Sequence, residues 1–241
     1  GAESGRVLRG EFDGARLRVQ EVYRFVNRPV SHPDGLYWDV AGLYTQALDG
    51  IARGLNHSGG IRSVGVDTWG NDFGLLDGAG ALLAPSWHHR TPRTAGMVDQ
   101  LLTSLDPDDL YRVTGTQFLP ITTACQLLAM RGLGDLDTAR RIAMLPDLIA
   151  FWLSGVAVTE RTIASTSQLW DIHQSRWATG VIERLGLPAS LFAADTGLLT
   201  MMHAENGPVI DVLAEQLVAA GKTDPYYHGI ARAWQMEEEA K

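Results

Sequence analysis

Gly65-Val66-Asp67-Thr68-Trp69-Gly70-Asn71-Asp72-Phe73-Gly74-Leu75-Leu76-Asp77 is the stretch that decides the fold of this chain. It predicts a buried strand, a glycine-containing turn and a second strand. Polar residues, namely Asp67, Thr68, Asn71 and Asp72, crowd the junction between the two strands. Polar side chains where a buried strand ends are better candidates for a site than the same side chains on a solvated helix.

This junction offers the mixture of groups that a sugar pocket requires. Thr68 and Asn71 provide hydrogen-bonding groups, and Trp69 provides an apolar wall. Gly70 lets a sugar hydroxyl come near the backbone, and Asp72 completes the polar set. The alternative is an ordinary strand end whose Asp and Asn residues cap a turn. The residues alone leave both interpretations open.

Two further segments are candidates for ligand contact. Ala2-Glu3-Ser4-Gly5-Arg6 is a possible tight turn whose backbone N–H groups and serine hydroxyl face a phosphate. Composition alone favours an ordinary small-residue turn there. Arg90 and Arg93 follow Trp87-His88-His89 and are candidates to hold a sugar or a carboxylate, with a solvated basic patch as the alternative. Adjacent histidines on an extended chain point to opposite faces, so no shared metal is expected.

Composition limits the class of protein. The chain has 241 residues, 45% hydrophobic and 20% charged, which is an ordinary composition for a soluble globular protein. The formal charge of -8 argues against nucleic acid or an anionic membrane as the main partner. No run approaches the roughly 20 apolar residues of a membrane span, and no signal peptide is recognised. The single cysteine, Cys125, favours a cytoplasmic location and is expected to be a buried structural thiol.

The predicted elements place strands mostly before helices, which indicates an α/β domain. The predicted strands cover residues 17–25, with a slip in register at Val22 and Tyr23, and residues 61–67, 73–76, 81–83 and 156–159. The predicted helices cover residues 40–55, 95–102, 107–114, 122–131, 136–143, 146–154 and 177–185, and residues 162–168 form a polar loop. Asp106 is the expected N-cap of the third helix.

Several motifs in order resemble the rhamnulokinases of the FGGY family of carbohydrate kinases. The matching pieces are Gly1–Val7, Asp67–Phe73, Trp87–Thr94, Thr114–Pro120, Met144–Asp147 and Ala164–Leu169. The resemblance covers about residues 1–192 and implies a ribonuclease-H-like, actin-type N-terminal lobe over residues 1–197. It implies an enzyme that phosphorylates a ketose such as L-rhamnulose with ATP and magnesium. Thr91 departs from the family pattern, which has aspartate there.

The resemblance also assigns roles by position. The ATP-phosphate turn falls on Ala2, Glu3, Ser4, Gly5 and Arg6, and the sugar-contacting glycine falls on Gly70, with Trp69, Asp72 and Arg90 as further sugar contacts. The metal-holding aspartate that precedes the turn, the catalytic aspartate and the adenine-binding second lobe have no counterpart in this chain. The chain by itself is therefore expected not to turn over sugar efficiently, and a second lobe is an expected partner.

Residues 198–241 resemble a different family, the dihydropyrimidinases. The similarity rests on Leu199–Pro208 and Gly221–His228, within an expected helical tail. In that family the histidine corresponding to His203 binds metal, but the other ligands have no counterpart here, and one imidazole cannot hold a dinuclear centre. A fragment of such a hydrolase, or a chimeric chain without catalytic activity, is the alternative to a kinase lobe.

Overall fold

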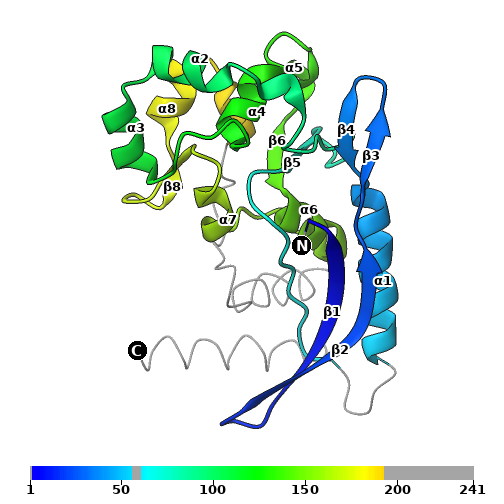
Figure 1. The fold of residues 1–241 in the computed structure, drawn as a ribbon. Coiled ribbons are helices and arrows are strands. Elements are labelled where there is room, and N and C mark those ends of the chain that lie inside the picture. Colours follow the sequence, from blue (N-terminus) through cyan, green and yellow to red (C-terminus); the bar gives the residue numbers. More distant parts are fainter. Residues whose placement is uncertain (1, 56–60, 193–241) are drawn as a thin grey trace.

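Strands pair as four antiparallel two-stranded sheets within residues 2–55 and 61–192, the parts that the computed structural model describes (Figure 1). The pairs are β1 (Ser4–Phe12) with β2 (Leu17–Val26), β3 (Pro29–His32) with β4 (Gly35–Trp38), β5 (Phe73–Leu76) with β6 (Arg141–Met144), and β7 (Trp170–Asp171) with β8 (Arg176–Trp177). The predicted tail, including His203, lies outside these residues. Within residues 2–55 and 61–192, no helix is long and apolar enough to cross a membrane.

The β1–β2 hairpin confirms the predicted slip in register. Val7 faces Tyr23 while Leu8 faces Glu21, so Val22 is the extra residue of a bulge. The hairpin also corrects the prediction of a turn over residues 2–6, because Ser4, Gly5 and Arg6 belong to β1. A Cβ on Gly5 would lie 1.9 Å from the ring of Phe25 on the neighbouring strand. Packing against that ring therefore requires glycine at this position.

Helix α1 (Val40–Leu55) has the predicted bounds and packs along the hairpin (Figure 1). A Cβ on Gly50 would lie 2.2 Å from Val7 Cγ2, so this glycine lets the hairpin approach the helix closely. On another side of the helix, the Tyr44 hydroxyl donates a hydrogen bond to the carbonyl of Trp152, 3.0 Å away in α6 (Leu145–Ser154). The glycine that weakens the helix intrinsically is therefore a packing residue.

Strand β6 corrects the predicted helix over residues 136–143. Helix α5 stops at Thr138, and the chain then extends to pair antiparallel with β5. A short apolar run does not distinguish strand from helix by its period. Here Ile142, Ala143 and Met144 are all buried, and the fully buried β5 provides a ladder for them. Tertiary pairing has overridden the local preference.

Residues 61–67 and 156–159 were predicted as strands and are not strands. The first segment runs beside β1 without a ladder (Figure 1), and the second follows the left-handed Gly155 that ends α6. The turn at Asp77–Gly80 is confirmed, with the Asp77 N–H donating to the carbonyl of Ala81. Residues 81–83 form no ladder with β5, only the isolated bridge between Leu82 and Leu76.

The remaining elements gather at the end of the molecule away from the β1–β2 turn (Figure 1). They are η1 (Pro92–Thr94), α2 (Met97–Ser104), α3 (Pro107–Thr114), α4 (Thr123–Met130), α5 (Asp135–Thr138), α7 (Arg161–Ser165), α8 (Thr179–Arg184) and η2 (Ala189–Phe192). Asp106 caps α3 as predicted, accepting from the N–H of Asp109 at 3.0 Å. Residues 161–165 are helical where a loop was expected. Leu101, Leu127 and Leu169 are fully buried in the core of this part.

Candidate functional site

Asp72 is a completely buried carboxylate on which several elements converge. It lies directly before β5, and its Oδ2 accepts from the indole N–H of Trp38 at 2.6 Å and of Trp69 at 2.8 Å. His89 Nδ1 is 2.6 Å from the same oxygen. Gln126 Nε2 donates to Oδ1 at 3.0 Å. Four donors therefore satisfy a charged group that would be costly to bury alone.

Gln126, from α4, connects Asp72 to the arginine of η1. Its two Nε2–H groups are shared among Asp72 and the carbonyls of Asn71 and Ile121, and its Oε1 accepts from Arg93 Nη2 at 3.0 Å. Arg93 Nη1 donates to the Gln126 carbonyl at 2.7 Å, and its guanidinium lies over the ring of Trp87. Burial lowers the pKa of Arg93 to about 10, so the group stays charged at neutral pH.

The two histidines of the Trp87–Arg90 segment lie on one side of the chain, not on opposite faces as predicted. A turn at His89 and Arg90 brings the two imidazole rings together, with their centroids 4.6 Å apart. His88 stacks on Trp38 at 4.1 Å and accepts at Nδ1 from the N–H of Arg90. Burial lowers the pKa of His88, and the neighbouring His89 adds to that effect, so His88 is neutral at pH 7.

The turn that carries Gly70 and Asn71 is held from two sides. Asn71 adopts a left-handed conformation with φ of 73°, and its N–H donates to Thr166 Oγ1 at 3.1 Å. Its carbonyl accepts from Thr123 Oγ1 at 2.7 Å. A Cβ on Gly70 would lie 2.9 Å from Thr166 Oγ1, so glycine allows this close approach. The glycine thus has a packing role here, whether or not a ligand contacts it.

Two further buried carboxylates, Asp147 and Glu160, lie next to the helix that precedes Thr166. Asp147, in the first turn of α6, accepts from the N–H of Glu160 at 3.2 Å. Glu160 in turn caps α7, accepting from the N–H groups of Thr162 and Ile163, each at 2.8 Å. Burial raises the pKa of Asp147 well above its usual range. Asp147 therefore has a structural role. It fixes Glu160, the N-cap of α7, and Thr166 directly follows that helix.

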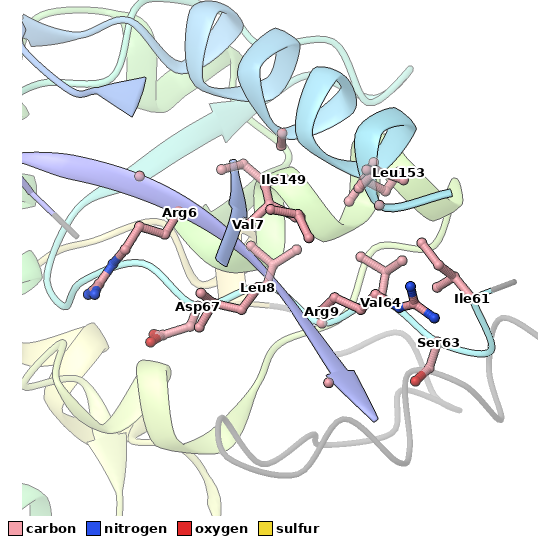
Figure 2. Close-up of a pocket in the computed structure, with 18 of the residues that line it drawn as sticks. Arg6, Val7, Leu8, Arg9, Ile61, Ser63, Val64, Asp67, Ile149 and Leu153 are labelled. Carbon is pink, nitrogen blue, oxygen red and sulfur yellow. The ribbon is translucent and has the colours of Figure 1, made fainter. Parts of the chain in front are cut away.

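One pocket brings together two segments that sequence reasoning assigned to different ligands. Gly5 and Arg6 of β1 line it, and so do Asp67, Thr68 and Trp69 (Figure 2). Arg6 and Asp67 lie at the same end of the pocket in that view.

The remaining predicted contacts lie apart from this pocket's lining. Ala2, Glu3 and Ser4 precede the lining part of β1, and Gly70 and Asp72 lie just beyond Trp69. Arg90 is exposed, whereas Arg93 points inward to Gln126. In the described ranges, no three His, Cys, Asp or Glu side chains are placed together to hold a metal ion.

Sequence reasoning did not predict three of the partners of Asp72. Trp38 and Gln126 lie far from it in the chain, and His89 was assigned no role. A single sequence carries no signal for Trp38 or Gln126, because only tertiary pairing brings them to the carboxylate. His89 was detectable in principle, since a turn-forming segment rich in aromatic and imidazole rings is unusual on a surface.

This chain is similar in sequence to known proteins over most of its length. The sequence profile of the FGGY family of carbohydrate kinases, N-terminal domain, matches residues 19–199. The chain belongs to that family. It is 35% identical over 196 residues to a rhamnulokinase of Mannheimia succiniciproducens, a match that covers 80% of this chain and 41% of the relative. It is 34% identical over 194 residues to a rhamnulokinase of Oceanobacillus iheyensis, with coverage of 80% and 41%.

A solved structure confirms the fold of this FGGY chain. The crystal structure of xylulose kinase from Rhodospirillum rubrum superimposes with a TM-score of 0.65 at 19% identity, covering 83% of this chain and 46% of that one. The predicted ribonuclease-H-like, actin-type N-terminal lobe is therefore confirmed. The chain spans about two fifths of the length of the curated relatives that it matches.

Proposed function

We propose that this chain is the sugar-binding lobe of a kinase that phosphorylates a ketose, with L-rhamnulose as the first candidate and ATP as the phosphate donor. The observation that carries the proposal is the 35% identity to a rhamnulokinase over 80% of the chain. The ordered surroundings of Asp72 support it, because they hold an aromatic wall and fixed polar groups next to a pocket.

The sugar contacts are proposed at Trp69, Gly70, Asp72 and Arg90. Asp72 acts mainly by orienting its neighbours, since its oxygens already accept four hydrogen bonds. Trp69 presents its ring as the wall against which a sugar packs. Arg90 is exposed beside this cluster, where a flexible cation is available to the hydroxyls of a ligand.

His89 adds one polar atom to this set. Asp72 holds the ring through Nδ1, so Nε2 is the ring nitrogen left for a ligand. The side chain of His89 is 12% exposed, which is enough for one polar contact. We therefore propose that His89 Nε2 forms a hydrogen bond with a sugar hydroxyl.

The phosphate end of the reaction is proposed at Ala2, Glu3, Ser4, Gly5 and Arg6. Arg6 is exposed and lines the same pocket as Trp69. A phosphate bound by the Arg6 guanidinium would therefore lie in the same pocket as the proposed sugar contact Trp69. The base that takes the proton of the attacking sugar hydroxyl is proposed to lie outside this chain. No residue of the chain is assigned to magnesium, because the described residues provide no ligand cluster for it.

Calorimetric titration of the whole chain with L-rhamnulose tests this proposal. We expect saturable binding, stronger than that of D-xylulose, and little ATP consumption by the chain alone. The variant Trp69→Ala should weaken binding roughly two- to tenfold, since aromatic contacts contribute roughly 0.5–1.5 kcal/mol beyond area burial. Asp137→Asn, a change on the exposed side of α5, is the matched control and should leave binding unchanged. Equal affinity for both sugars, or no binding to a folded chain, would contradict the proposal.

A further inference from the structure

Thr166 supports the turn that carries Gly70 and Asn71 through one hydroxyl group. Its Oγ1 accepts from the N–H of Asn71 at 3.1 Å and donates to the carbonyl of Ile163 at 2.7 Å. A hydroxyl has a single O–H donor, so the bond to Ile163 leaves the oxygen lone pairs for Asn71. The hydroxyl is therefore committed to the turn as an acceptor, which a valine side chain cannot provide.

The chain around Thr166 is fixed independently of the turn. Thr166 directly follows α7. The carbonyl of Ser165 accepts from Thr116 Oγ1 at 3.1 Å, and the carbonyl of Ser167 accepts from the N–H of Ala124 at 3.0 Å. Both neighbours of Thr166 in the sequence are thus tied to other parts of the lobe. Thr166 is therefore a fixed support for the turn and does not depend on the turn for its own position.

The hydrogen bond from Asn71 also sets the direction of the Gly70 carbonyl. The N–H of Asn71 and the carbonyl of Gly70 belong to the same peptide group, which is planar and trans. Because the N–H points to Thr166, the carbonyl oxygen points away from Thr166. The next peptide group is held as well, since the Asn71 carbonyl accepts from Thr123 Oγ1 at 2.7 Å. Two consecutive peptide groups of the turn are therefore fixed in direction.

The Gly70 carbonyl is available to a ligand. Within residues 2–55 and 61–192, no N–H or hydroxyl group donates a hydrogen bond to its oxygen. Gly70 and its neighbours Trp69 and Asn71 are only half-buried, which leaves the turn accessible from outside. A main-chain acceptor of this kind is satisfied by water or by a ligand that donates a hydrogen bond. A sugar hydroxyl is such a donor.

We propose that Thr166 is a positioning residue for sugar binding, whose hydroxyl orients the Gly70 carbonyl to accept a hydrogen bond from a hydroxyl of the ligand. The inference rests on the proposed function, since Gly70 is one of its sugar contacts. Thr166 lies far from Gly70 in the sequence and acts only through the turn. A carbonyl that is oriented in advance reduces the ordering that the sugar must impose when it binds.

Two variants of the whole chain separate the hydroxyl of Thr166 from the bulk of its side chain. Thr166→Val removes the oxygen, whereas Thr166→Ser keeps it and removes the methyl group. The matched control is Thr103→Val, which removes an exposed hydroxyl that donates to the carbonyl of Asp99 at 2.8 Å in α2. In calorimetric titration with L-rhamnulose, Thr166→Val should bind roughly two- to tenfold more weakly than the parent, the equivalent of one net hydrogen bond. Thr166→Ser and Thr103→Val should bind like the parent.

Two further measurements report on the turn itself. Amide hydrogen exchange at Asn71 should be about fivefold faster in Thr166→Val than in the parent and unchanged in Thr166→Ser, because only valine lacks the acceptor. The carbon-13 chemical shift of the Gly70 carbonyl should move when L-rhamnulose is added to the parent or to Thr166→Ser. The same addition should move it less in Thr166→Val.

Three results would overturn the inference. Equal affinity of a folded Thr166→Val variant and the parent would show that the turn needs no support from the hydroxyl. Equal weakening by valine and by serine would assign the effect to packing of the methyl group. An unchanged Gly70 carbonyl signal in a parent that binds the sugar would exclude this carbonyl as a contact. If the parent itself binds no L-rhamnulose, the proposed function is wrong, and the exchange rate of Asn71 alone decides whether Thr166 orients the turn.

Discussion

Replacing Asp72 by asparagine should destabilise the chain markedly, although the two side chains have the same shape. An asparagine oxygen in place of Oδ2 still accepts from Trp38, Trp69 and His89, but each bond falls from about 1.5–3 to about 0.5–1.5 kcal/mol because the charge is gone. Its NH2 group then faces Gln126 Nε2, donor against donor, at 3.0 Å. The lower cost of burying a neutral group offsets part of this loss. We expect a net loss of about 2–4 kcal/mol.

Gln126 cannot rotate its amide to relieve the clash. Its Oε1 accepts from Arg93, and its Nε2 shares its N–H groups with the carbonyls of Asn71 and Ile121, so rotation would set Nε2 against the Arg93 donor and Oε1 against both carbonyls. The expected loss corresponds to a fall of roughly 4–16 °C in melting temperature. Urea unfolding followed by tryptophan fluorescence measures it, and Trp38 and Trp69 report directly on the site.

The control for this experiment is Asp137→Asn, which removes an exposed carboxylate of α5 and should change stability by less than about 0.5 kcal/mol. If Asp72→Asn unfolds at the same urea concentration as that control, the four hydrogen bonds do not stabilise the fold, and the reasoning from buried charge is wrong. If it is stable but loses sugar binding, the carboxylate acts on the ligand directly rather than by orienting its neighbours.

Three other predictions concern packing, pH and thiol chemistry. Gly5→Ala should cost about 1–3 kcal/mol in urea unfolding because its Cβ meets the Phe25 ring, whereas Gly180→Ala, with open space around its Cβ in α8, should gain up to about 1 kcal/mol. Burial raises the pKa of Asp147, so its contribution to stability is full below the unfolded value of about 3.9 and is lost as pH rises through the folded pKa. Asp147→Asn should therefore gain stability relative to the parent between about pH 4 and pH 7, and an unchanged difference would contradict this. Burial raises the pKa of Cys125, which is 0% exposed, so a thiol reagent should label the native chain at least about 100-fold more slowly than the chain in urea.

The helices that carry their own end signals were predicted well from the sequence. α1 and α3 have the predicted bounds, and α6 differs by one residue at its start. Asp106 and Gly155 explain the last two cases, because a side-chain cap and a left-handed glycine act within a few residues of the chain. Local chemistry is visible in a single sequence, so these boundaries are predictable.

The strands were predicted less well because pairing decides them. β6 was predicted as helix, and the β3–β4 hairpin was not predicted. Residues 61–67 have the composition of a strand but belong to none of the sheets in the described part of the chain, which shows that β propensity describes suitability for a sheet rather than membership of one. The register slip at Val22 was visible because it interrupts the alternation along β2 itself.

The candidate site was predicted in part for the same reason. Trp69, Gly70 and Asp72 were recognisable because they are concentrated at one junction, and the structure shows that this junction is ordered. The partners that fix Asp72 come from β4, α4 and the segment before η1. These side chains reach Asp72 only because the fold brings β4, α4 and the segment before η1 together, so no local sequence pattern predicts the contact.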